Sequence, residues 1–157
     1  MKQGIRIGGV FQFVKRTAAG TIVDAWQTHN LVTTEGLVAL LQDYFQGSSQ
    51  TVMHIALLGT TPSIIASTTA GSITEITSYS GNRQAFVSVV SAGTCTNSAS
   101  TVTYTFTTAA AIGGAALIGA SSGTAVLFCG AAGSEKSLAD TETLEVTYSV
   151  TAADDGA

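Results

Sequence analysis

The clearest pattern in this chain lies in residues 30–47, which read Asn30-Leu31-Val32-Thr33-Thr34-Glu35-Gly36-Leu37-Val38-Ala39-Leu40-Leu41-Gln42-Asp43-Tyr44-Phe45-Gln46-Gly47. The larger apolar residues recur at the i, i+3, i+4, i+7 and i+8 spacing that places side chains on one face of a helix. These residues are Leu37, Leu40, Leu41, Tyr44 and Phe45. Because so short a helix is marginal by itself in water, we expect this apolar stripe to be buried against the rest of the protein.

Both ends of the predicted helix carry capping signals. Thr33 or Thr34 can accept a hydrogen bond from a free backbone N–H at the start, and Glu35 suits the positive end of the helix dipole. Gly47 can adopt the left-handed conformation that ends a helix. The segments around it have strand patterns, so we expect the helix to lie over one end or one face of a β-sandwich.

Strand signals fill most of the remaining chain. Residues 4–16 and 21–27 predict a hairpin, with Gly8-Gly9 as a bulge or bend. Residues 52–58 are apolar nearly throughout, which is typical of a strand covered on both faces. Residues 101–107 alternate, which predicts that Val102, Tyr104 and Phe106 face the core. Further strands are expected at 73–76, 84–90, 114–118, 124–129 and 144–150, and loops at 59–72, 91–100 and 130–140.

These eight or nine strands predict an all-β protein. We expect an antiparallel β-sandwich, jelly-roll-like, with one short amphipathic helix. Residues 1–151 are interpreted as a single domain and residues 152–157 as a short acidic C-terminal tail.

Charge is sparse and unevenly placed. Charged residues make up 10% of the 157 residues, against roughly 25% in an average soluble protein. The net charge of −4 argues against nucleic-acid binding, which needs clustered Lys and Arg. A weakly charged surface gives little repulsion between copies, which favours a chain destined for a repeating assembly.

Cysteines and hydropathy indicate a protein folded in the cytosol. Cys95 and Cys129 form no disulfide scaffold and have no metal-ligand spacing, and Cys129 is expected to be a buried thiol. The N-terminus lacks the continuous apolar core of a signal peptide. Residues 109–133 are uncharged and long enough to cross a bilayer, but the turn at 120–124 favours two buried strands.

One motif suggests catalysis but lacks its context. Gly119-Ala120-Ser121-Ser122-Gly123 matches the G-x-S-x-G elbow, which needs a strand-to-helix turn and a histidine downstream. Here a strand follows, and His29 and His54 both lie upstream, so a hairpin turn is favoured. The histidines also lack further metal ligands, and His54 is expected to be a satisfied core or interface side chain. We therefore predict no enzymatic activity, no metal and no cofactor.

The segments taken together resemble virion proteins of tailed bacteriophages, in particular capsid cement (head decoration) proteins. The resemblance is carried, in chain order, by the hairpin ending in Trp26, Asn30-Leu31-Val32-Thr33, Gly36-Leu37, Met53-His54-Ile55-Ala56-Leu57, Tyr79-Ser80-Gly81-Asn82-Arg83-Gln84-Ala85, Asn97-Ser98-Ala99-Ser100, Val102-x-Tyr104-x-Phe106, Ile112-Gly113-Gly114-Ala115, Thr124-x-x-Leu127-Phe128 and Thr141-x-Thr143-Leu144-x-Val146-Thr147-Tyr148. The sequence departs from similar proteins at Val52, Met53 and His54, where they tend to carry aromatic residues, and in the following loop, where they carry more acid and tryptophan.

The resemblance implies a β-sandwich, often jelly-roll-like, bound to the outer face of an icosahedral head. We therefore expect a non-enzymatic structural protein that stabilises the head, made in the host bacterial cytoplasm and located on the outer capsid surface. Its partners would be the major capsid protein and other copies of itself, as a homodimer or homotrimer, with no nucleic acid and no membrane. The expected contact residues are Lys2, Arg6, Pro62, Tyr79, Asn82 and Arg83.

Alternative functions remain open at this point. The chain could be a tail-associated structural protein, which would form rings, or a receptor- or glycan-binding module. A binding module would carry aromatic residues on its loops, whereas Trp26 lies in a predicted strand. An esterase would require Ser121.

Overall fold

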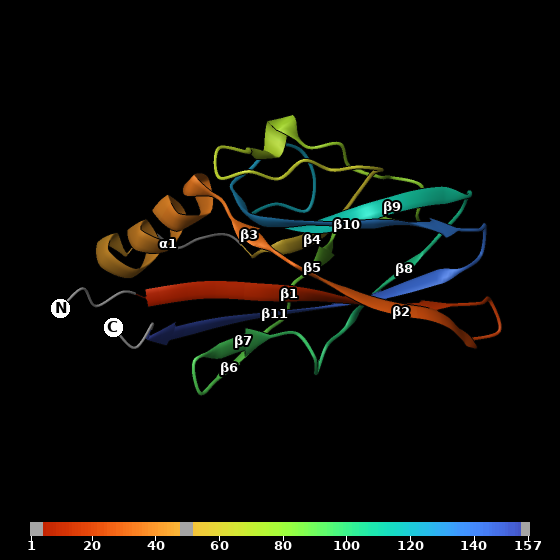
Figure 1. The fold of residues 1–157 in the computed structure, drawn as a ribbon, viewed down its shortest axis with the longest axis horizontal. Coiled ribbons are helices and arrows are strands. Elements are labelled where there is room, and N and C mark those ends of the chain that lie inside the picture. Colours follow the sequence, from red (N-terminus) through yellow and green to blue (C-terminus); the bar gives the residue numbers. More distant parts are fainter. Residues whose placement is uncertain (1–4, 48–51, 155–157) are drawn as a thin grey trace.

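The structure is a computed structural model that describes residues 5–47 and 52–154, and it consists of two β-sheets that face each other (Figure 1). The first sheet has the strand order β2-β1-β11-β7-β6, with β8 also pairing with β11. The second sheet has the order β3-β10-β9-β4-β5. The pairings between named strands are antiparallel. The predicted all-β sandwich is confirmed, while the jelly-roll arrangement stays a prediction.

The elements have the following bounds. The strands of the first sheet are β1 (Ile5–Arg16), β2 (Ile22–His29), β6 (Val89–Ser91), β7 (Thr94–Thr96), β8 (Val102–Thr105) and β11 (Thr143–Asp154). Those of the second sheet are β3 (Leu31–Val32), β4 (His54–Leu58), β5 (Gln84–Ala85), β9 (Ala110–Ile118) and β10 (Leu127–Leu138). The helix α1 spans Thr34–Gln46, and a short 3₁₀ helix, η1, spans Ala70–Ser72. Strand β11 pairs with β1 as far as Asp154, beyond residue 151, where the sequence placed the end of the domain.

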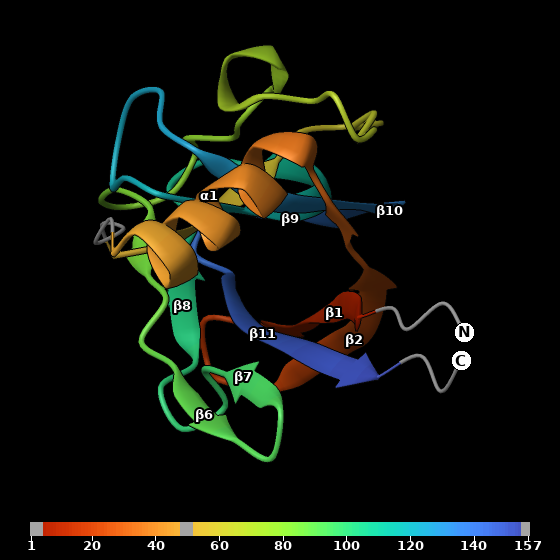
Figure 2. The ribbon, with the colours of Figure 1, turned by 90° about the vertical axis from the view of Figure 1, so that its left-hand side faces the viewer.

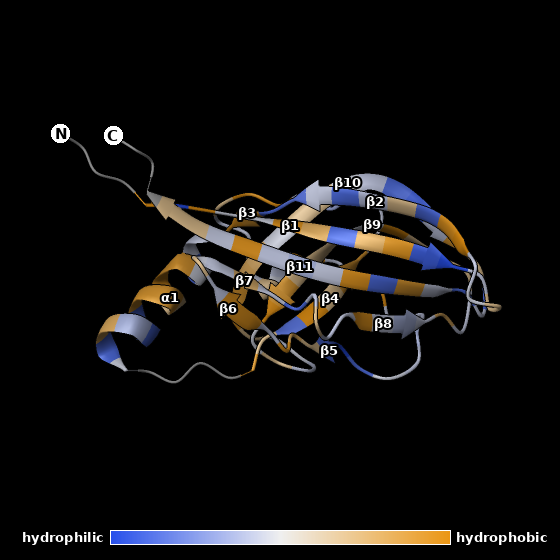
Figure 3. Ribbon diagram, turned by 90° about the horizontal axis from the view of Figure 1, so that it is seen from below, coloured by the Kyte–Doolittle hydropathy of each residue, from blue (hydrophilic) through white to orange (hydrophobic). Residues whose placement is uncertain are grey.

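Alternation along the strands builds the core between the sheets. Val102, Tyr104 and Phe106 are buried, as their period of two predicts. Phe11 of β1 and Tyr148 of β11 are fully buried and lie in contact, with ring centroids 4.3 Å apart. The alternating hydropathy of β1 and β11 is visible as bands along both ribbons (Figure 3).

The second sheet is covered on both faces. Ile55, Ala56, Leu57 and Leu58 of β4 are all 0% exposed, which confirms the prediction made from the apolar run. Ile55 and Leu57 enter the core between the sheets, whereas Ala56 and Leu58 belong to a second cluster on the outer side. Residues of the segment that follows β4, among them Ile64 and Ile73, pack over this second cluster.

Some predicted boundaries were wrong. Residues 130–140 are not a surface loop, because β10 continues to Leu138 and pairs with β9 across a bulge between Ala132 and Lys136. Their Gly, Ala and Ser residues give no strand signal, and pairing with β9 imposes the strand. The predicted strand 84–90 is divided between β5 and β6, which belong to different sheets. The predicted strand at 73–76 contributes only an isolated bridge at Glu75. The predicted loop 91–100 contains strand β7.

The predicted bulge at Gly8-Gly9 is also absent. The pairing of β1 with β11 runs without a register shift through Gly8↔Thr151 and Gly9↔Val150. A Cβ at Gly9 would lie 2.6 Å from the Tyr148 hydroxyl oxygen, so close packing against Tyr148 explains this glycine.

The caps of α1 are confirmed. The Thr33 hydroxyl accepts a hydrogen bond from the Gly36 N–H at 3.0 Å, and Gly47 ends the helix with φ of 65°. The Glu35 carboxylate accepts a hydrogen bond from the Leu127 N–H at 3.1 Å, which fixes the start of α1 to β10.

The predicted burial of the apolar stripe was wrong. The buried residues of α1 are Gly36 and Ala39, and Tyr44 and Phe45 are 82% and 75% exposed. A Cβ at Gly36 would collide with the Phe128 carbonyl oxygen, so the helix approaches β10 through its smallest residues. Leu41, Tyr44 and Phe45 are therefore exposed, and α1 lies at one end of the molecule (Figure 2).

Candidate functional site

Four of the predicted contact residues lie in one segment of the chain. Pro62, Tyr79, Asn82 and Arg83 belong to the segment 59–83. Together with the β9–β10 turn at 119–126, this segment covers the outer side of the second sheet (Figure 1). We call these two segments the loop face.

The inner side of the loop face packs closely on glycines of the second sheet. A Cβ at Gly113 would lie 2.5 Å from Pro62 Cδ, and one at Gly130 would lie 3.0 Å from Ile64 Cδ1. Glycine at these positions lets the long segment lie directly on the strands. Pro62 is accordingly half-buried, with its ring against the sheet.

Backbone hydrogen bonds fix the loop face to its neighbours. The Gly59 N–H donates to the Thr74 carbonyl at 2.9 Å, and the Ile76 N–H donates to the Leu57 carbonyl at 2.9 Å. The Thr34 N–H, at the start of α1, donates to the Ala66 carbonyl at 2.8 Å. The segment is therefore tied to β4 and to the helix, which accounts for an ordered path in a segment this long.

Arg83 joins the two segments of the loop face. Its Nε and Nη2 donate to the Glu75 carboxylate at 2.9 and 2.7 Å, and its Nη1 donates to the Ala120 carbonyl at 3.0 Å. The hydrogen bonds with Glu75 raise the pKa of Arg83 further above its ordinary value. A bidentate pair of this kind, mostly shielded from water, holds both loops in one geometry.

The residues of the predicted 79–83 turn have different environments. Tyr79 is buried, with its ring 4.6 Å from that of Tyr104, and burial raises the pKa of Tyr79 to about 12. Asn82 is exposed, and its carbonyl accepts a hydrogen bond from Gln84 Nε2 at 3.2 Å. The exposed Asn82 can therefore contact a partner, whereas the buried Tyr79 ring packs against Tyr104 in the core.

A cleft of about 150 Å³ lies between the 79–83 turn and the β9–β10 turn. It is lined by Glu75, Thr77, Tyr79, Gly81, Asn82, Arg83, Ser121, Ser122 and Gly123. Ser121 lies on an exposed turn between two antiparallel strands, which the Gly119 N–H closes by donating to the Val126 carbonyl at 2.9 Å. The G-x-S-x-G match is therefore a hairpin turn, as predicted, and no histidine is among the described residues that line the cleft.

Arg6 lies apart from the loop face. It is an exposed residue of β1, paired with Ala153 of β11. Lys2 lies outside the described residues. The structure thus brings Tyr79, Asn82 and Arg83 together at one cleft, while Pro62 lies against Gly113 and Gly114 of β9.

Sequence reasoning missed Glu75, the partner of Arg83. A signal was present, because Glu75 is the single acid between Asp43 and Glu135, and Arg83 is the single base between Arg16 and Lys136. A single acid and a single base eight residues apart in an otherwise uncharged region are expected to form an ion pair. No comparable pattern in the sequence indicates the contact between Arg83 and the Ala120 carbonyl.

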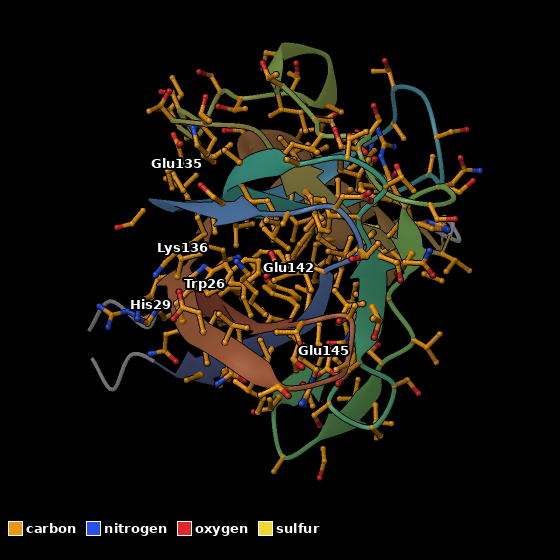
Figure 4. All side chains as sticks on the ribbon, turned by 90° about the vertical axis from the view of Figure 1, so that its right-hand side faces the viewer. Trp26, His29, Glu135, Lys136, Glu142 and Glu145 are labelled. Atoms are coloured by element: carbon orange, nitrogen blue, oxygen red, sulfur yellow. The ribbon has the colours of Figure 1, made fainter. Side chains whose placement is uncertain are left out.

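The other ion pairs gather at the end of the sandwich opposite α1 (Figure 4). Lys15 lies 2.9 Å from Glu142, Arg16 lies 2.8 Å from Glu145, and Lys136 lies 2.7 Å from Asp24. Lys136 Nζ also lies 5.3 Å from the centroid of the Trp26 ring. These pairs connect β1 and β2 with the region of β10 and β11.

These ion pairs also perturb two carboxyl groups. The hydrogen bond with Lys136 lowers the pKa of Asp24. The pKa of Glu142 is lowered mainly by its hydrogen bond from the Ala139 N–H and, to a smaller extent, by its hydrogen bond with Lys15. Of the described Lys and Arg residues, only Arg6 is outside such a pair. Four of the five described basic side chains are therefore neutralised by ion pairs within the molecule.

Three further features bear on chemistry. Among residues 5–47 and 52–154, no group of three or more His, Cys, Asp or Glu side chains is placed to hold a metal ion. His54 is half-buried, and its Nδ1 is buried without a hydrogen-bond partner. The prediction that the hydrogen-bonding groups of this side chain are satisfied was therefore wrong for Nδ1. Cys95 and Cys129 are both free thiols, and Cys129 is buried as predicted.

The described part of the chain contains no helix that is both long and apolar enough to cross a membrane. Comparison with known protein families finds no family model that matches the sequence, and comparison with curated proteins finds no matching relative.

Proposed function

We propose that this protein is a non-enzymatic structural component of a tailed-bacteriophage virion, which binds the outer surface of the capsid lattice and stabilises the head. The observation that carries the proposal is the loop face, a broad outer layer that is fixed before any partner binds. Its acid and its base, Glu75 and Arg83, are already paired with each other. Such a surface binds by shape and hydrogen bonding rather than by charge.

Preorganisation favours this use of the loop face. A surface loop that is ordered on binding costs conformational entropy, and a loop already tied to the strands avoids most of that cost. Exposed hydroxyl groups are spread across the layer as donors and acceptors for a partner. They belong to Thr60, Thr61, Ser63, Ser67, Thr69, Ser72, Thr74, Thr77, Ser121 and Ser122.

The proposed mechanism acts at junctions between capsid subunits. Each copy contacts neighbouring subunits, so that opening of the shell must break both the junction and the contacts with this protein. A ligand that binds only the assembled state stabilises that state by about 2.7 kcal/mol when its free concentration is a hundred times its Kd. Because identical sites repeat over the lattice, modest contacts at each site are sufficient.

A second candidate function is a tail-associated or glycan-binding module. A shallow hollow of about 510 Å³ lies against the first sheet, and its lining includes Gln12, Gln27, Thr101 and Thr147. Side-chain amides and hydroxyls are suitable partners for sugar hydroxyl groups. This hollow lies on a different sheet from the loop face, so the two functions predict different contact surfaces.

The test is binding to purified virion parts. Protein is mixed with mature heads that lack it and with isolated tails, and its position is determined by cryo-electron microscopy. The proposal predicts saturable binding to the head with the loop face toward the shell. Binding to tails alone would reject it, and contact through the Gln12–Gln27 side would favour the second candidate.

Two matched substitutions separate the surfaces. Asn82→Trp places a large side chain on the exposed 79–83 turn, and we expect it to weaken binding to heads. Gln27→Trp makes the same addition at an exposed position of β2, and we expect binding to be unchanged. Equal binding by both variants would contradict the assignment of the loop face.

A further inference from the structure

Five apolar side chains lie on the exposed side of α1. Leu37, Val38, Leu41, Tyr44 and Phe45 are all exposed. With 3.6 residues per turn, they occupy an arc of about 120° on the side of the helix away from Gly36 and Ala39. We call these five side chains the helix face.

Neighbouring strands extend the helix face. Ile5, at the start of β1, is 79% exposed, and Leu31 of β3 is also exposed. Both line, together with Leu37, a groove of about 430 Å³ between α1 and the start of β1. Apolar side chains of α1, β3 and β1 therefore share this groove, with Asn30 also in its lining.

The helix face projects far enough for a partner to reach it. Thr33, the cap of α1, and Gly36 in its first turn approach the backbone of β10, and Ala39 and Leu40 line a groove with residues of both sheets. Tyr44 and Phe45, near the other end, are the most exposed members of the face. Figure 2, which looks onto this end, shows α1 lying in front of the two sheets.

We propose that the occupant of the helix face is a second copy of this chain, with two α1 helices packed antiparallel about a two-fold axis. The face contains no acidic or basic side chain. A charged partner would find no complement there, whereas two copies of the same apolar face meet without repulsion. A two-fold axis makes one such patch sufficient for both partners.

The available area is consistent with a stable dimer. A standard interface buries roughly 800 Å² on each partner. Aromatic side chains bury about 150–250 Å² each, so Tyr44 and Phe45, exposed at 82% and 75%, alone supply a substantial part of that area. Leu37, Val38, Leu41 and Ile5 supply more. In an antiparallel pair, the positive end of each helix also lies beside the negative end of the other.

The dimer leaves the loop face uncovered, because the loop face lies over the outer side of the second sheet and α1 lies at one end of the molecule (Figure 1). The inference is independent of the proposed function, since it concerns the protein alone in solution. Each dimer would present two loop faces to any partner.

The test is the mass of the protein in solution by analytical ultracentrifugation over a range of concentrations. The double variant Tyr44→Lys/Phe45→Lys places two charges within the proposed interface. Lysine near the end of a helix suits its negative pole, so these substitutions do not weaken α1 itself. We expect the unmodified protein to sediment as a dimer, and the variant to dissociate with a Kd roughly tenfold higher or more.

A control substitution distinguishes this interface from general adhesion. Val23→Lys changes a residue of β2 that is also exposed and lies next to the β1–β2 turn, away from α1. This variant should remain a dimer, and circular dichroism of both variants should match that of the unmodified protein. A monomeric unmodified protein, a dimer unaffected by Tyr44→Lys/Phe45→Lys, or a trimer would each overturn the proposal.

Discussion

Gly8 and Gly9 are adjacent residues of one strand with opposite constraints. A Cβ at Gly8 would meet nothing within 4 Å, whereas one at Gly9 would lie 2.6 Å from the Tyr148 hydroxyl and 2.8 Å from the Ser149 carbonyl oxygen. Tyr148 is also held by the Asn30 side-chain amide and by the Cys129 thiol, which donate to its hydroxyl at 2.9 and 3.2 Å. Tyr148 therefore has little freedom to move away.

We predict that Gly9→Ala lowers the free energy of unfolding by about 1–3 kcal/mol, because it overpacks a fixed core side chain. Gly8→Ala should leave stability unchanged or raise it by up to about 1 kcal/mol, since alanine loses less backbone entropy than glycine on folding. Urea denaturation of the two variants measures the difference. Equal stability of the two variants would show that Tyr148 is not the reason for Gly9.

Cys129 makes stability depend on alkaline pH. The thiol is fully buried, and desolvation raises its pKa from 9.0 to about 11. At pH values between these two, the folded protein therefore retains the thiol proton that the unfolded chain has already lost. This contribution to stability is complete below the pKa of the unfolded thiol and is lost as the pH rises through the folded value.

We predict that the free energy of unfolding falls by about 1 kcal/mol between pH 8 and pH 10 as the unfolded thiol ionises. Cys129→Ala should be less stable at pH 8, because it leaves a cavity, but its stability should fall less steeply over this range. Burial raises the pKa of Tyr79 to about 12, so its unfolded form begins to ionise before its folded form near the upper end of this window, and this loss is the same in both proteins. Parallel slopes for the two proteins would contradict a buried neutral thiol.

At the scale of single residues, the sequence predicted the burial or capping role of a side chain, but not which residues distant in sequence contact it. It predicted that Cys129 is buried and that Thr33 could cap a helix, and both were confirmed. It misread Gly9 as a bulge because the constraint on this residue comes from Tyr148, which is distant in sequence. A contact between β1 and β11 is not encoded in the local pattern of either strand.

The helix α1 is positioned mainly through its first turn. Thr33 is fully buried, and its hydroxyl accepts from the Gly36 N–H while it donates to the Leu127 carbonyl. Its own N–H donates to the Phe128 carbonyl at 3.1 Å. One threonine therefore both caps α1 and fixes it to β10.

We predict that Thr33→Ala lowers the free energy of unfolding by about 1–2 kcal/mol, which is the cost of losing a cap and a buried hydrogen bond. Thr34→Ala is the matched control, because Thr34 is exposed and contributes through its backbone N–H, which alanine retains. Hydrogen exchange of the α1 amides, measured with overall stability, locates the effect. A larger loss in Thr34→Ala would show that the wrong residue is assigned as the cap.

At the element scale, local signals predicted where α1 begins and ends, but not which side of it is buried. The periodicity placed the large apolar residues on one face of the helix, and we predicted that this face is buried. The buried residues are instead Gly36 and Ala39, because the close approach of Gly36 to the Phe128 carbonyl leaves no room for a larger side chain. The second half of β10 escaped prediction because its residues become a strand only by pairing with β9. Tertiary contacts decided both cases.

The whole molecule has two unlike ends and a covered side. Ion pairs between β1, β2 and the β10–β11 region lie at one end, and the helix face lies at the other (Figures 1 and 4). The loop face covers the second sheet between them. This arrangement separates the surface proposed for self-association from the surface proposed to bind the capsid lattice.

At this scale, composition and strand patterns were sufficient to predict the sandwich, because alternation and apolar runs determine which faces are buried. They were not sufficient to predict the loop face, which arises when segments 59–83 and 119–126, remote in sequence, meet through Arg83 and Ala120. The proposed function rests on that assembled surface.

The most direct measurement is the temperature at which phage heads lacking this protein are disrupted, compared before and after saturation with it. The account predicts a higher disruption temperature with the protein bound, and a smaller increase with Asn82→Trp than with Gln27→Trp. An unchanged disruption temperature at saturating concentration would contradict the proposed stabilising role.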